Sequence, residues 1–82
     1  MVKFVEAYVL VNCDAGKSWE IAKAALKFGN VKMAHAVTGQ YDVVAFIEFA
    51  GMEVLTNILE KFQTLKGVRG THTAVAIPQK LK

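Results

Sequence analysis

A glycine, a phenol and a carboxylate stand close together in residues 38–42 of the 82-residue chain, which read Thr-Gly-Gln-Tyr-Asp. Gly39 can take a positive φ and so close a turn between the apolar runs on either side. Asn-Gly or Asp-Gly alone would satisfy a turn, so Tyr41 and Asp42 exceed what the turn requires. Two interpretations follow: Tyr41 is a strand-end aromatic and Asp42 a turn acceptor, or the two side chains form a binding edge.

Groups that could move a proton are few. The candidates are His35, His72, Tyr41 and Asp42, and no nucleophile stands at a recognisable spacing from a base. Cys13 is the only cysteine, which rules out an intramolecular disulfide, and we interpret it as a packing residue. Positions 13, 35 and 72 match no metal-ligand spacing, so we expect no metal and no cofactor.

Length and composition indicate one domain, 1–82, that associates with itself. A chain of 82 residues buries a thin core, yet 54% of its residues are apolar, and large exposed apolar surfaces mark interfaces. The longest apolar runs, 7–11 and 43–47, are far shorter than the roughly 20 residues of a membrane-spanning helix. No signal-peptide pattern is present either, so we expect a cytoplasmic protein without a membrane partner. The net charge of +3 includes one arginine, Arg69, and forms no dense basic stripe for nucleic acid.

The hydrophobic pattern predicts six elements. Strands are expected at 3–12, 31–37, 43–49 and 68–78, and helices at 17–28 and 52–66. The second helix has apolar residues at 55, 58, 59, 62 and 65, the spacing of an amphipathic helix. In the first helix we expect Trp19 to pack over the first turn and Leu26 to join the buried side. Gly29 and Asn30 are expected to stop that helix in the left-handed conformation.

The order βαββαβ predicts an α+β fold, the ferredoxin-like sandwich. Right-handed crossovers then place both helices on one face of a four-stranded antiparallel sheet. Three of the four strands are apolar or small on both faces, which a sheet with one wet face would not show. We therefore predict a homodimer through bare sheet faces or edges. It buries either Phe4, Tyr8 and Leu10 or their opposite set, and the sequence does not decide which set faces the helices.

Two segments carry a resemblance to a known family. They are 38–44, Thr-Gly-Gln-Tyr-Asp-Val-Val, and 67–73, Gly-Val-Arg-Gly-Thr-His-Thr. Both resemble the effector-binding (RAM) domain of the Lrp/AsnC family of amino-acid-responsive transcription regulators, whose patterns are T-G-x-Y-D-h-h and G-V-x-x-T-x-T, with h apolar. Residues 7–11 and 15–17 are similar to that family's first strand and Pro-Gly-Lys turn, with Ala15 in place of the proline. The resemblance covers about residues 4 to 77.

The resemblance implies a ligand site. In the family, dimers assemble into octamers or larger rings and an amino acid lies between dimers. The implied site residues are Gly39, Tyr41 and Asp42 from the hairpin and Thr71 and Thr73 from the last strand. Asp42 could accept from the ammonium group, and the threonine hydroxyls and the amides beside Gly39 could donate to the carboxylate. The alternative for Thr71 and Thr73 is strand propensity alone.

The resemblance also implies a function. Family regulators carry a helix-turn-helix domain ahead of this one, whereas here the first sheet strand begins at Lys3, as in a stand-alone version. Neither predicted helix is free to enter a DNA groove, so we expect no sequence-specific DNA binding. We predict a non-catalytic amino-acid-binding and oligomerisation module, linked to transcription regulation or amino-acid metabolism, with full-length Lrp/AsnC-type regulators as further candidate partners.

The alternative is a small enzyme of the dimeric α+β barrel type, a monooxygenase or isomerase. It would gain support if His35 and His72 lined one enclosed pocket. Binding of RNA on the exposed sheet is a third possibility, but the signature of such domains is missing from the third strand.

Overall fold

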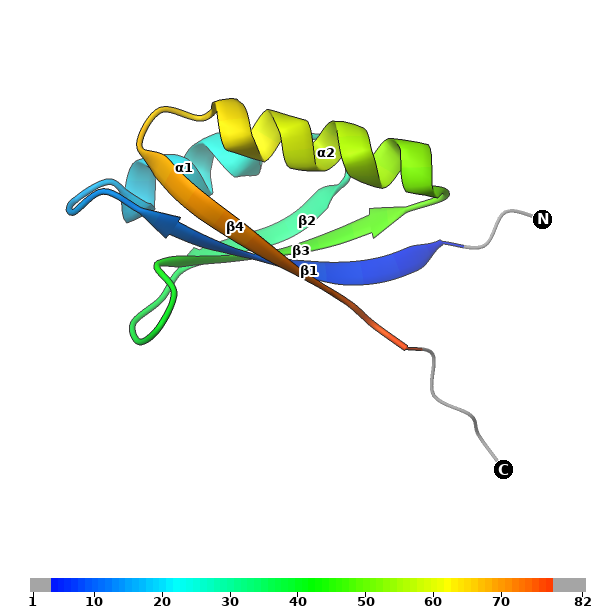
Figure 1. Cartoon of the computed structure of the whole chain (residues 1–82), viewed down its shortest axis with the longest axis horizontal. Coiled ribbons are helices and arrows are strands. Elements are labelled where there is room, and N and C mark those ends of the chain that lie inside the picture. Colours follow the sequence, from blue (N-terminus) through cyan, green and yellow to red (C-terminus); the bar gives the residue numbers. More distant parts are fainter. Residues whose placement is uncertain (1–3, 78–82) are drawn as a thin grey trace.

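Four antiparallel strands form one sheet, and two helices pack on one face of it (Figure 1). The computed structural model describes residues 4–77. The elements are β1 (Val5–Cys13), α1 (Ser18–Ala25), β2 (Val31–Ala36), β3 (Val43–Phe49), α2 (Met52–Thr64) and β4 (Val68–Val75). The strand order is β2-β3-β1-β4, so β1 and β3 are central and β2 and β4 are edges. The predicted ferredoxin-like βαββαβ fold is confirmed.

The face beneath the helices holds the core. Ala7, Val9 and Val11 of β1 are completely buried and lie opposite Ile47, Ala45 and Val43 of β3. The predicted stripe of α2 is confirmed, with Leu55, Ile58 and Phe62 buried against the sheet. The ring of Phe62 meets that of Phe28 edge-on, with centroids 5.4 Å apart. The question left open by the sequence is thus answered: the set that includes Ala7 faces the helices, and the set that includes Tyr8 does not.

The opposite face of the sheet, called here the open face, has no helix of residues 4–77 over it (Figure 1). Strand register places its side chains in two rows, each crossing all four strands. One row is Met33, Phe46, Tyr8 and Ala74, and the other is His35, Val44, Leu10 and His72. The rings of Tyr8 and Phe46 lie 5.2 Å apart, yet Tyr8 remains 44% exposed and Met33 49% exposed. A large apolar surface is therefore left in water.

The first helix differs from its prediction. It ends at Ala25 rather than at residue 28, and the chain leaves it through two tight turns in which Lys27 and Phe28 donate to Ala24 and Ala25. The expected left-handed stop is wrong, since neither Gly29 nor Asn30 has a positive φ. In this way Phe28, rather than a further helical turn, is packed against the core.

The outer side of α1 was also predicted wrongly. Trp19 is 78% exposed and Leu26 is 50% exposed, whereas both were expected to pack. The helix packs against the edge strand β2, so the residues on its outer flank have no further strand to cover them. The hydrophobic pattern gives the period of a helix but not the width of the sheet below it.

Other boundaries shift slightly. Strand β1 begins at Val5 and β4 ends at Val75, while Lys3 and the predicted strand-end Pro78 lie outside the described residues. Within the described part of the chain, no helix is long and apolar enough to cross a membrane.

Candidate functional site

The turn between β2 and β3 offers bare backbone to a ligand. Gly39 has a φ of +112°, as its place in the turn predicted, and no heavy atom lies within 4 Å of where a Cβ would stand. A larger residue would be strained there by its φ alone. The amides beside Gly39 can therefore be approached from outside the protein.

Asp42 joins this turn to the central strand β1. Its backbone N–H donates to the Val11 carbonyl at 2.9 Å, and its carbonyl accepts from the Val37 N–H at 2.9 Å. Its carboxylate Oδ2 accepts from the Cys13 N–H at 2.8 Å. The Asp42 carboxylate is thus an acceptor for the neighbouring strand β1 rather than for its own turn. A carboxylate has about four acceptor sites, so this half-buried group keeps capacity for a further donor.

Tyr41 lies against the open face. Its ring meets the imidazole of His72 edge-on, with ring centroids 5.5 Å apart. His72 pairs with Leu10 across the strands and so belongs to the open face. The contact of Tyr41 with His72 was not predicted, although strand alternation in β4 places His72 on the face opposite its threonine neighbours.

Thr71 and Thr73 lie on the other side of the sheet. They pair with Val11 and Val9, whose side chains are buried beneath the helices. The Gln63 side-chain amide of α2 stands 3.5 Å from the Thr71 hydroxyl, at the outer limit of a hydrogen bond. Within one chain the five predicted residues therefore form two groups: Gly39, Tyr41 and Asp42 at the hairpin, and the two threonines on the helix side of β4.

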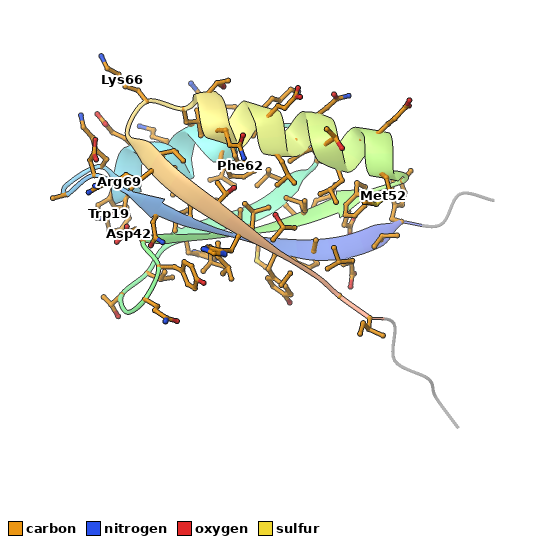
Figure 2. The ribbon with its side chains drawn as sticks, viewed as in Figure 1. Trp19, Asp42, Met52, Phe62, Lys66 and Arg69 are labelled. Atoms are coloured by element: carbon orange, nitrogen blue, oxygen red, sulfur yellow. The ribbon has the colours of Figure 1, made fainter. Side chains whose placement is uncertain are left out.

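A small pocket of about 190 Å³ adjoins Thr71. It is lined by Gln63, Val68, Arg69, Gly70 and Thr71. The Arg69 guanidinium stands 3.8 Å from the exposed Asp14 carboxylate, an ion pair that water screens. Arg69 and Asp42 lie at the same end of the sheet (Figure 2). No ligand role was predicted for Arg69, yet its guanidinium is suited to bind a carboxylate.

The two histidines do not share a site. His35 and His72 stand in one row on opposite edge strands, separated by Val44 and Leu10. Three strand spacings put them roughly 14 Å apart. Among residues 4–77 no three His, Cys, Asp or Glu side chains gather as a metal site would require.

The Cys13 thiol is buried at the end of β1. Desolvation raises its pKa above the ordinary value, and the negative charges of Asp42 and Asp14 and a hydrogen bond to Asp42 act in the same direction. The thiolate is the nucleophilic form of cysteine, so Cys13 is held as an unreactive thiol.

We predict that Asp42→Ala lowers the free energy of unfolding by about 1 to 3 kcal/mol, because the Cys13 N–H loses a charged acceptor. Asp42→Asn should cost less, since its amide oxygen can accept the same bond. Urea unfolding at one fixed protein concentration measures both. Asp14→Asn is the matched control, and equal stabilities of Asp42→Ala and that control would contradict the prediction.

We also predict that Cys13 reacts with iodoacetamide many times more slowly than free cysteine at a mildly alkaline pH of about 8. A raised pKa keeps the thiol protonated there, and reactivity should appear only as the pH rises further. Mass spectrometry of the folded protein, with the urea-unfolded chain as the reactive control, measures the rate. Alkylation of the folded protein as fast as that of the unfolded chain would refute it.

Comparison with known proteins assigns the chain to a family. Residues 6–82 match the Lrp/AsnC ligand binding domain. The HTH-type transcriptional regulator FL11 of Pyrococcus furiosus is 34% identical over 71 residues, which are 87% of this chain and 47% of the regulator. The chain thus spans about half the length of the curated relatives it matches.

Two solved structures extend the comparison. TTHA0845 from Thermus thermophilus is 25% identical with a TM-score of 0.87, over 95% of this chain and 99% of that one. The transcriptional regulator NMB0573 from Neisseria meningitidis, solved as a complex with L-Met, is 20% identical with a TM-score of 0.78, over 95% of this chain and 53% of that one. It shares the fold. As the two motifs predicted, the chain belongs to the Lrp/AsnC ligand-binding-domain family, the effector-binding module of transcription regulators.

Proposed function

We propose that this module binds a free amino acid at the hairpin and assembles with copies of itself, without catalysing a reaction. One observation carries the proposal: the Asp42 carboxylate is fixed by the Cys13 amide beside the approachable backbone of Gly39. A fixed, half-exposed carboxylate suits an ammonium group, and free amides suit a carboxylate. A site for a free amino acid needs both the carboxylate and the free amides, because the ligand carries an ammonium group and a carboxylate.

A second copy completes the site. Thr71 and Thr73 lie on the sheet face opposite Tyr41, so one chain cannot direct all five residues at one ligand. Their hydroxyls, with the Arg69 guanidinium beside Thr71, can instead meet the ligand from a neighbouring copy. The L-Met complex of NMB0573 supports an amino acid as the ligand class.

The open face is the first assembly surface. Its largely apolar side chains are left in water by a single chain, and packing against a second open face would bury both rows, the two histidines included. Dimers then assemble further, to an octamer, and bring hairpins and β4 strands of different copies together. Full-length Lrp/AsnC regulators, which would carry the same domain, are candidate partners; this domain itself does not read DNA sequence.

The separation of the histidines favours binding over catalysis. A general acid and base must both reach one substrate, and His35 and His72 stand on opposite edge strands with apolar side chains between them. The relatives named as transcription regulators support the same choice.

Calorimetry against the twenty amino acids tests the ligand. We expect at least one to bind with a Kd of roughly 1 µM to 1 mM. Asp42→Asn should weaken that binding roughly 10- to 150-fold, because it removes the charge and keeps the bond to Cys13. The control Glu53→Gln, a change of an exposed carboxylate at the start of α2, should bind as the unaltered chain does. No measurable binding of any of the twenty amino acids, or equal binding by the two variants, would count against the proposal.

Sedimentation equilibrium tests the assembly. Phe46→Glu places a charge in the middle of an apolar row, so we expect it to lose the dimer at micromolar concentration, with partial loss of helical circular dichroism. Glu60→Lys, an exposed change on α2, is the control and should remain assembled. If the unaltered chain is a folded monomer at the same concentration, the assembly proposal is wrong.

A further inference from the structure

A second pocket, of about 460 Å³, lies where α1 passes over the edge strand β2. None of the residues of the proposed amino-acid site lines this pocket. Trp19 and Leu26, two helical turns apart, form its exposed walls, and the buried Ala22 and Ala34 form its floor. Its volume falls within the range of small-molecule pockets. We call it the α1 groove.

Small residues create the α1 groove. Ala22 and Ala34 face each other where helix and strand meet, and neither side chain is long enough to fill the space between the backbones. Trp19 stands beside that space with 78% of its surface in water. An indole left so exposed gains most from an apolar group that lies against it.

One charged side chain, that of Lys23, lines the α1 groove, and no carboxylate does. His35 borders the groove from the edge strand β2, but its imidazole belongs to the open face, where His35 pairs with Val44. Glu20, one turn before Lys23, has its Oε1 only 3.4 Å from the Lys17 ammonium. Among the ion pairs of residues 4–77, none includes Lys23, so its ammonium group is available to an anion.

We propose that the α1 groove binds a small amphipathic carboxylate, an aryl or branched-chain acid without an amino group. Its apolar body lies between Trp19 and Leu26 and its carboxylate meets Lys23. Without an acidic side chain the groove offers no carboxylate to an ammonium group, in contrast to the Asp42 hairpin. The groove also suits a small molecule better than a protein, because seven residues line it whereas a stable interface uses about 20 to 30 on each side.

The test uses Trp19 as its own reporter, because it is the only tryptophan of the chain. Titration with 3-phenylpropanoate should give a saturable change in tryptophan emission. Lys23→Met should weaken binding roughly 10-fold or more, since a charge-assisted contact is lost. Lys27→Met is the matched control, an exposed lysine of the same segment that does not line the groove, and it should bind as the unaltered chain does.

Two further measurements keep the outcomes apart. The neutral 3-phenylpropanamide should bind the unaltered chain no more tightly than the acid binds Lys23→Met. The Asp42→Asn variant should bind the acid as the unaltered chain does, whether or not it binds amino acids more weakly. An unsaturable response, equal binding of acid and amide, or equal effects of Lys23→Met and Lys27→Met would overturn the proposal. Tryptophan emission that changes with protein concentration, with no response to the acid, would overturn it in favour of a second copy in the groove.

Discussion

Two helices can cover only one face of a four-stranded sheet, and the other features of this chain depend on that limit. The residues of β1 and β3 that include Val9 and Ala45 are completely buried beneath the helices, while their neighbours Tyr8 and Phe46 stay in contact with water. Residues 4–77 hold no further element to close the open face. The same limit leaves α1 standing over the edge of the sheet, which exposes Trp19 and creates the α1 groove.

Hydrogen bonds to the central strand β1 fix the position of the β2–β3 hairpin. Turns on a sheet surface are usually among the mobile parts of a protein. Here Asp42 binds Val11 and Cys13 of β1 as well as Val37, so the residue just before β3 is held both to β1 and to the residue that follows β2. The Asp42 side chain proposed to contact the ligand therefore also stabilises the fold. Asp42→Asn, which preserves the shape of the side chain, is needed to separate the two roles.

Much of the fold could be predicted from the sequence because it depends on local periodicity. The spacing of Leu55, Ile58 and Phe62 determined α2, and the glycine of the turn took the positive φ expected of it. What the sequence could not reveal depends on distance across the sheet. Strand order leaves Trp19 exposed beside the edge strand β2. Strand register brings Asp42 to the Cys13 amide, 29 residues away in the chain. The two-faced pattern of β1 predicted an open face but not which residues formed it.

The two backbone bonds and the carboxylate bond of Asp42 also limit how a ligand signal could travel. A hairpin held to the central strand cannot move as a hinge without breaking those hydrogen bonds, which costs free energy. A change in the number of associated copies breaks none of them. A ligand held between copies stabilises their contact by RT ln(1 + [L]/Kd) for each site, and a ring with several such sites adds these increments. Weak individual binding would then become a steep dependence of particle size on effector concentration, with no change in the shape of any one chain.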